Sequence, residues 1–166
     1  ANSPKQRPNE NYAREFWELF TLGRDALYTE ADIREGSRAF TGITLLRDQD
    51  LDTRPIYDLL NHDETLKSIF PGRAQAANYN YRGVIDLTLA QPEAARYVAR
   101  NLFTYFVHDH PTDETVQQLA DLLVLHGFEI KPLARQILMS QALFSNEGRY
   151  NQISTPVEHW VGVART

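Results

Sequence analysis

Apolar side chains recur at helical spacing close to the start of the chain. The stripe consists of Tyr12, Phe16, Leu19 and Phe20. Charged side chains follow on the adjacent face at intervals of about four residues, the spacing of neighbours on one helix. The pattern predicts an amphipathic helix that ends at Gly23, with its apolar stripe facing a core and a charged flank beside it.

The same periodicity predicts helices along most of the remaining chain. They are expected at about residues 29–42, 92–111, 113–126, 131–142 and from 156 onward. Residues 84–89 fit a short helix or a strand, and the pattern leaves both open. The periodicity weakens over about residues 43–82, so a long irregular excursion is expected there. The fold class is therefore all-α, an irregular multi-helix bundle of about six to seven helices.

The two ends of the chain carry different expectations. Residues 1–8 contain two prolines among polar neighbours and are expected to form a loose leader. Residues 9–166 are expected to form a single helical domain, because a chain of this length can bury roughly 70% of its extended surface in one core. The first residue is Ala1, and the last segment still has a helical pattern at Thr166. We therefore expect a fragment of a larger protein.

Composition removes several classes of function. The formal net charge is -5, and the basic residues are scattered among acids, which argues against nucleic acid as a partner. There are no cysteines, so disulfides, cysteine-ligated zinc and thiol nucleophiles are excluded. No apolar run approaches the ~18 residues of a transmembrane helix, so no membrane span is expected in this segment.

Two patterns invite metal chemistry, and each is incomplete. Asp48, Asp50 and Asp52 have the spacing with which a calcium loop begins, but Thr53 replaces the glycine of the tight turn. A solvated acidic loop is favoured, with calcium or another divalent metal as the weaker alternative. The pairs His62-Asp63 and His108-Asp109 are similar to those of all-α metal-dependent phosphohydrolases, yet neither has a full ligand set. No cofactor is otherwise expected, and whether the chain is an enzyme stays open.

Several sequence blocks carry a resemblance. They are NENYAREFWELFTLG from Asn9, YTEADIREGSRAFTG from Tyr28, HDETLK from His62, and SQALFS with TPVEHWVGVAR near the end. Together they resemble a bacterial family catalogued only as a domain of unknown function, number 1800. The resemblance implies a substantial helical region upstream, which would make this chain a C-terminal half. It also implies export, hence an extracytoplasmic (periplasmic or secreted) location. The resemblance does not indicate any reaction that the protein would catalyse.

Polar positions that match the family pattern define a candidate cluster. Its members are Asn11, Arg14, Glu15, Glu18, Asp32, Arg38, His62, Asp63 and Lys67. We expect the stretch from His62 to Lys67 to fold back over the polar face of the first helix, where arginines would balance the acids. Such a buried network can be structural, since breaking one pair costs about 3 to 5 kcal/mol without any catalysis.

Two functional hypotheses follow from these observations. The leading one is a non-catalytic binding or assembly module whose partners are the upstream half of the same polypeptide and a protein at the cell envelope. The alternative is a metal-assisted hydrolase that shares its site with that upstream half. Its contributors would be Glu15, Glu18, His62, Asp63 and Lys67. Convergence of these side chains around an open pocket would favour the enzyme, and a closed, paired cluster would favour structure.

Overall fold

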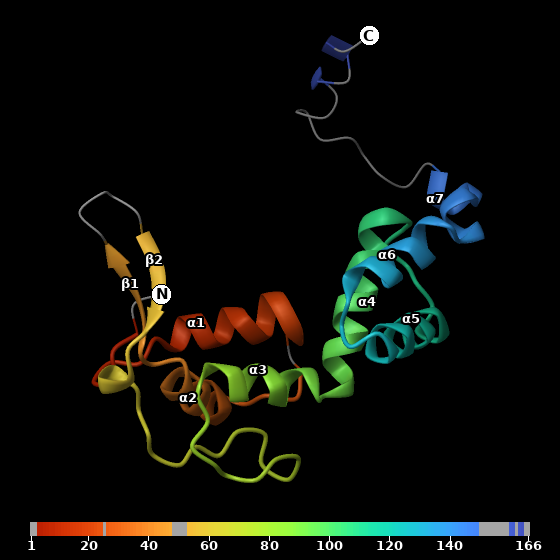
Figure 1. Cartoon of the computed structure of the whole chain (residues 1–166). Helices are drawn as coiled ribbons and strands as arrows, with labels where there is room; N and C mark the ends of the chain where they lie inside the picture. Colours follow the sequence, from red (N-terminus) through yellow and green to blue (C-terminus); the bar gives the residue numbers. More distant parts are fainter. Residues whose placement is uncertain (1–2, 25, 48–52, 150–159, 162, 165–166) are drawn as a thin grey trace. The chain divides into compact units, whose positions relative to one another are not determined.

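The computed structural model describes residues 3–24, 26–47, 53–149, 160, 161, 163 and 164. The described chain is largely helical, which confirms the all-α prediction (Figure 1). Backbone contacts divide the chain into two compact units, Ala1–Ala94 and Ala95–Thr166, where the sequence predicted one helical domain. Each unit has its own hydrophobic core.

The first helix begins where the sequence predicts and then changes its winding. α1 (Glu10–Glu15) is capped by the Asn9 side chain, which accepts a hydrogen bond from the Tyr12 amide at 3.1 Å. It continues as the π-helical η1 (Phe16–Thr21), and the Trp17 carbonyl accepts bonds from the amides of both Leu22 and Gly23. A π-helix bonds residue i to i+5 and has a wider turn, so the 3.6-residue period stops predicting which side chains face inward.

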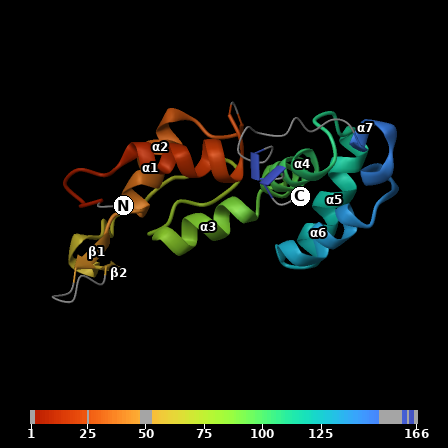
Figure 2. The ribbon, with the colours of Figure 1, turned by 90° about the horizontal axis from the view of Figure 1, so that it is seen from above.

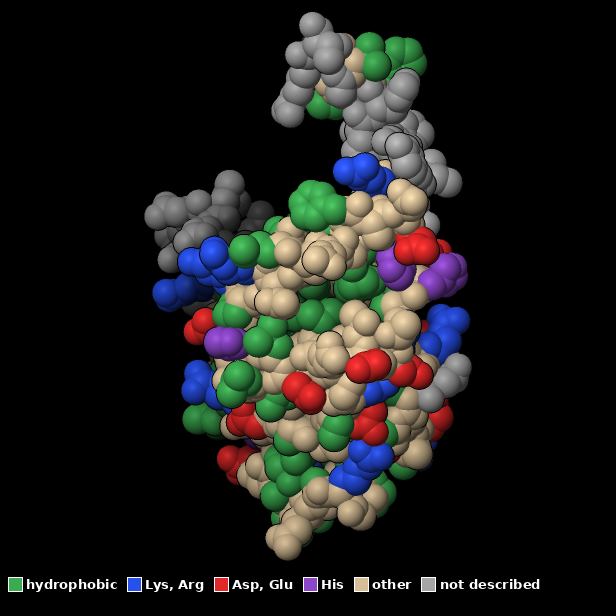
Figure 3. Space-filling view, turned by 90° about the vertical axis from the view of Figure 1, so that its right-hand side faces the viewer, with side chains coloured by type: hydrophobic (Ala, Val, Ile, Leu, Met, Phe, Trp, Pro, Cys, Tyr) green, Lys and Arg blue, Asp and Glu red, His purple; other side chains and the backbone are tan. Residues whose placement is uncertain are grey.

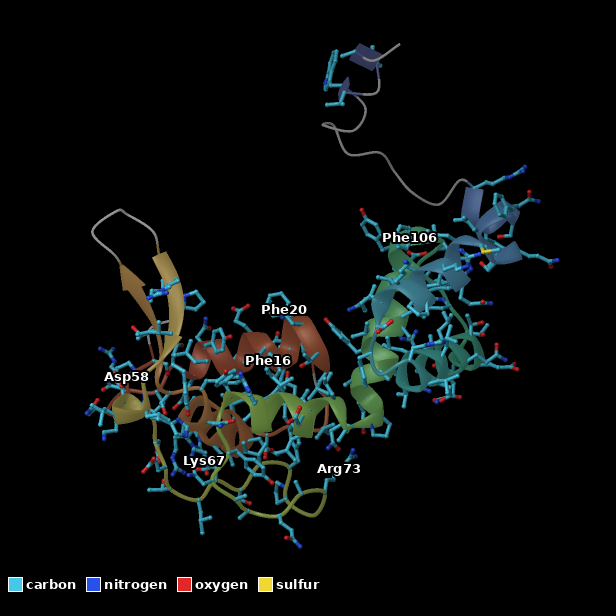
Figure 4. The ribbon with its side chains drawn as sticks, viewed as in Figure 1. Phe16, Phe20, Asp58, Lys67, Arg73 and Phe106 are labelled. Atoms are coloured by element: carbon cyan, nitrogen blue, oxygen red, sulfur yellow. The ribbon has the colours of Figure 1, made fainter. Side chains whose placement is uncertain are left out.

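The predicted apolar stripe is right for Phe16, which packs against the core with its ring centroid 5.3 Å from that of Phe40, and wrong for Leu19 and Phe20. Ala13 and Trp17 are the residues with no exposed surface, whereas Leu19 is 50% and Phe20 67% exposed. Figure 4 shows Phe20 pointing away from the core of the unit. This segment thus buries one large indole and presents Leu19 and Phe20 to solvent.

α2 (Glu30–Ala39) begins with a cap that neighbouring residues in the sequence provide. Thr29 and Asp32 form a capping box, in which each side chain accepts a bond from the other residue's amide. Beyond α2, the excursion predicted as irregular contains an antiparallel hairpin of β1 (Ile43–Arg47) and β2 (Thr53–Tyr57), followed by the short 3-10 helix η2 (Leu59–Asn61). The pattern concealed the hairpin because two adjacent leucines and Pro55 break the alternation. A two-stranded sheet tolerates Pro55, since both of its strands are edges.

The segment expected to be a loose leader is held at Ser3. This side chain is buried, its amide donates to the Ile43 carbonyl at 3.4 Å, and its carbonyl accepts from the Gly42 amide at 3.0 Å. Its hydroxyl also accepts from the Asn9 amide at 3.1 Å, which ties the start of α1 to the hairpin. Figures 1 and 2 both show the hairpin projecting from this end of the first unit.

The core of the first unit is built around Trp17. Its indole stacks on Tyr28 with ring centroids 5.7 Å apart and lies 5.2 Å from Phe70. Its Nε1 donates to the hydroxyl of Thr88 at 2.9 Å. Thr88 belongs to α3 (Tyr81–Leu89), so the segment that the sequence left open between helix and strand is a helix.

The second unit contains α4 (Pro92–Phe106), α5 (Asp113–Leu125), α6 (Ile130–Leu138), the 3-10 turn η3 (Gln141–Phe144) and α7 (Asn146–Arg149). α4 begins in the last residues of the first unit. α4 and α5 each bury one apolar face at helical spacing, which includes Ala99 and Phe103 on α4 and Val116 and Leu123 on α5. On α6 only Leu133 and Ile137 are buried, while Leu138 faces solvent.

Candidate functional site

The charged residues of the first helix pair near the start of α2. Arg14 donates through both terminal nitrogens to the two carboxylate oxygens of Glu30, each at 2.7 Å. The hydrogen bond from Arg14 lowers the pKa of Glu30. Glu18 binds Arg24 at 2.8 Å. Both pairs are partly or largely exposed, so each contributes little to stability, as surface ion pairs generally do.

A second group of polar residues lies at the C-terminal end of α2. Arg38 donates from Nε to Asp63 at 2.8 Å and from Nη1 to both carboxylate oxygens of Glu35 at 2.7 Å. The remaining nitrogen of Arg38 donates to Thr65. Lys67 follows two residues later along the same loop. We call Glu35, Arg38, Asp63, Thr65 and Lys67 the α2 clasp, because they fasten the loop after η2 to the helix.

The electrostatics of the clasp favour charged Asp63. Partial burial alone would raise the pKa of this carboxyl, but hydrogen bonds from Arg38 and from the Thr65 hydroxyl and amide outweigh it and hold the pKa well below its usual range. The Asp63 hydrogen bond in turn raises the pKa of Arg38. Both groups therefore stay ionised and paired, which is how a structural ion pair behaves.

Lys67 is completely buried, and its ammonium group contacts neutral oxygens. Nζ donates to the backbone carbonyls of Asp63 and Thr65 and to the side-chain oxygen of Asn78, the last at 3.2 Å. Its backbone also pairs with Ala77 through two hydrogen bonds. Burial lowers the pKa of Lys67, while the charge of Asp63 works against that shift. Lys67 thereby joins the two sides of the irregular loop (Figure 4).

This burial predicts a pH-dependent stability. A lowered folded-state pKa means that the native protein binds fewer protons than the unfolded chain between that pKa and the ordinary value of 10.5, so the contribution of Lys67 rises with pH there. We expect the free energy of unfolding of the native protein, relative to Lys67→Met, to increase as the pH rises through the alkaline range toward 10.5.

Urea denaturation of both proteins across that range measures the difference. Burial also raises the pKa of Tyr57, but Tyr57 is present in both proteins, so its contribution cancels in the difference between their free energies of unfolding. A difference that stays constant or falls with pH would show that the surrounding carbonyl oxygens hold the ammonium charged.

His62 lies beside the clasp and is also buried. Its Nδ1 is 3.0 Å from the Thr41 carbonyl and 3.3 Å from the Thr41 hydroxyl. That hydroxyl donates to the Arg38 carbonyl and accepts from the Asp63 amide at 2.8 Å. Thr41 therefore links the end of α2 to the loop through three contacts, and His62 completes the link.

Asp32 serves a different purpose from the one expected. One carboxylate oxygen accepts from the Thr29 amide and hydroxyl at 2.8 and 2.7 Å, and the other accepts from the Phe70 amide at 2.7 Å. Phe70 has a positive φ of 52°, a conformation that a bulky side chain rarely adopts. Asp32 thus caps α2 and holds a strained turn, with backbone donors in place of the expected arginines.

The structure brings together some of the nine candidate residues and separates others. Arg38, His62, Asp63 and Lys67 meet at the C-terminal end of α2, where the loop folds against this helix and not against the first. Arg14 and Glu18 are engaged near its N-terminal end. Glu30 and Arg38 mark the two ends, and a rise of 1.5 Å per residue places their backbones about 12 Å apart. Asn11 is exposed, and Glu15 lines a shallow depression of about 290 Å³ with Arg14 and Glu18.

Sequence reasoning missed three members of this arrangement. Glu35 was overlooked, although its spacing of three residues from Arg38 is that of a helix ion pair. Thr65 binds Asp63 two residues earlier, a local pairing typical of Asp and Thr in turns. Asn78 had no local signal, because it approaches Lys67 from 11 residues further along.

The expectations about metal sites and membrane spans can be compared with the described residues only. Among the residues that the structure describes, no group of three His, Asp or Glu side chains is placed to hold a metal ion. Asp48, Asp50 and Asp52 lie outside the described residues. The described helices include none that is both long and apolar enough to cross a membrane.

Comparison with known proteins decides the family. The sequence profile of a family described as "Protein of unknown function (DUF1800)" matches residues 1–166, the whole chain. The chain belongs to the DUF1800 family. No curated protein and no solved structure matches it. In this DUF1800 chain, several polar side chains make structural bonds: Asn9 caps α1, Asp32 caps α2, and Thr41 links α2 to the loop.

Proposed function

We propose that this DUF1800 chain is a non-catalytic binding or assembly module of a larger, exported bacterial protein. The observation that supports this proposal is the closed bonding of the α2 clasp. Both carboxylate oxygens of Asp63 accept hydrogen bonds, and Lys67 Nζ is surrounded by three acceptors. Groups engaged in this way are poor general acids, bases or nucleophiles, which need a free position directed at a substrate.

The arrangement gives the hydrolase alternative no support. His62, Asp63 and Lys67 meet at the C-terminal end of α2, whereas Glu15 and Glu18 line a depression with Arg14, which binds Glu30 at the N-terminal end of this helix. A shared catalytic site requires side chains within hydrogen-bond reach of one reacting centre. A closed network is what a structural role predicts.

The exposed aromatic stripe of the first helix supports an assembly role. Leu19 and Phe20 are large, apolar and at least half exposed, and Tyr12 is 37% exposed one to two turns earlier. Exposed apolar surface of this kind commonly marks a protein interface. The partner we propose for it is the upstream half of the same polypeptide.

A binding measurement tests this proposal. The upstream region and this chain are produced separately, and their affinity is measured by calorimetry. We expect Phe20→Asp to weaken the complex at least about tenfold, since a buried interfacial aromatic typically contributes more than ~1.4 kcal/mol. Leu60→Asp is the matched control, because Leu60 is 84% exposed on η2 and should leave the affinity unchanged.

Two results would contradict the proposal. One is the absence of binding between the two native pieces, and the other is equal loss of affinity in both variants.

The exported location rests on the resemblance, and fractionation of cells that make the whole protein tests it. Recovery from the cytoplasm would overturn that part.

A further inference from the structure

The second unit has a depression between α5, α6 and η3 that the proposed function does not use. Its volume is about 400 Å³, within the range of roughly 300–1,000 Å³ that is usual for small-molecule sites. Phe103, Leu119 and Ile137 are buried and form its apolar floor. Figure 3 shows hydrophobic side chains among uncharged polar atoms on the face of this unit that it presents. A floor of this kind can cover the ring of a small organic molecule.

None of the described side chains that line the depression is charged. Its polar lining consists of two amides and two hydroxyls, from Thr115, Gln118, Gln136 and Ser140. An ionised ligand would exchange water for this uncharged lining, and that transfer is unfavourable. The lining therefore favours an uncharged ligand.

The polar side chains of the depression offer mainly acceptors. The amide nitrogen of Gln118 donates to Glu114 at 3.3 Å, which leaves the side-chain oxygen of Gln118 to accept. The hydroxyl of Ser140 donates its single hydrogen to the Ile137 carbonyl at 2.7 Å, so only its lone pairs are available to a ligand. A ligand group that donates hydrogen bonds without carrying a charge suits these two oxygens.

We infer that this depression binds a small uncharged molecule with an apolar ring and a neutral hydrogen-bond donor of the carboxamide type. The ring covers the apolar floor, and the donor faces the oxygens of Gln118 and Ser140. The amide of Gln136 can both donate and accept, so it can bond the carbonyl oxygen of the same carboxamide. This site lies in the second unit, so it does not depend on the first-helix surface used in the proposed function.

Three compounds of similar shape test the site. Naphthalene-1-acetamide is neutral and has a donor, its methyl ester counterpart is neutral and has none, and naphthalene-1-acetate is charged. Titration of each compound into the isotope-labelled full chain, followed by NMR, measures the affinity and locates the site. We expect the amide to bind at least about tenfold tighter than the ester and the acetate, because one hydrogen bond or one avoided desolvation separates them. The resonances that shift should belong to α5, α6 and η3.

Gln118→Ala removes one of the two acceptors. It should reduce the ratio of amide to ester affinity about threefold or more, the effect of losing one hydrogen bond, while the ester affinity stays the same. Gln141→Ala is the matched control, because Gln141 is an exposed glutamine of η3 that does not line the depression. Both positions are exposed, so the fold should stay intact in both variants.

Several results would overturn the inference. They are the absence of amide binding, equal affinities for the three compounds, shifts outside α5, α6 and η3, and a ratio that Gln118→Ala leaves unchanged. Shifts of the same helices that depend on protein concentration alone would also overturn it and assign the depression to a second copy of the chain.

Discussion

Replacing Trp17 by alanine should destabilise the first unit by about 3 to 5 kcal/mol, the usual cost of removing a large buried aromatic side chain. The substitution removes the stacking on Tyr28 and Phe70 and the hydrogen bond to Thr88. It leaves a cavity where η1 packs against α2 and α3. Urea denaturation followed by far-ultraviolet circular dichroism measures the loss, and Trp17→Phe provides a milder variant if the alanine variant does not fold.

Phe20→Ala is the matched control, because Phe20 lies on the same helical segment and is 67% exposed. We expect its effect to stay within about 0.5 kcal/mol, as for most surface substitutions. A cost for Phe20→Ala similar to that for Trp17→Ala would show that the 3.6-residue stripe, and not the π-helical register, decides what is buried.

Gly36 provides an independent check on the position of the indole. A methyl group at this glycine would lie 2.5 Å from Cη2 of Trp17, so Gly36→Ala alone is expected to cost about 1 to 3 kcal/mol through overpacking. In the Trp17→Ala background the added methyl has space, and the cost should largely disappear. Additive effects of the two substitutions would contradict this contact.

Replacing Asp32 by alanine is expected to cost about 3 kcal/mol, which combines about 1 kcal/mol for a lost helix cap with 1–3 kcal/mol for an amide left without an acceptor. The orphaned amide belongs to Phe70, whose backbone is held at a positive φ. Denaturation measures the total effect. Hydrogen exchange at the Phe70 amide, which should become faster, isolates the loss of the turn.

Glu30→Ala is the control for Asp32→Ala. Glu30 lies in the same turn of α2 and carries the same charge, but its ion pair with Arg14 is largely exposed, so its loss should cost at most about 1 kcal/mol. If the two variants were equally destabilised, a general charge effect at the helix start would account for the result. An unchanged rate of hydrogen exchange at the Phe70 amide would likewise contradict the role of Asp32 in holding this turn.

The candidate site could be predicted only in part. Three residues of the clasp, Arg38, Asp63 and Lys67, belong to the candidate cluster, and the closeness of His62, Asp63 and Lys67 in sequence made their grouping predictable. The helix against which they pack, α2 and not the first helix, was not predictable. Arg14 and Arg38 are both on amphipathic helices at similar spacing from acids, so periodicity offers no reason for one to meet Glu30 and the other Asp63.

The sequence by itself determined most helix positions, the Thr29–Asp32 cap and the inward faces of α4 and α5, because each depends on residues a few positions apart. Only the tertiary structure decided that Trp17 lies at the centre of the core while Leu19 and Phe20 face solvent. It also decided that Asp32 holds Phe70 and that the loop closes on α2. These contacts join residues 71, 38 and 25 positions apart, and no local pattern records which distant partner fits a given space or donor.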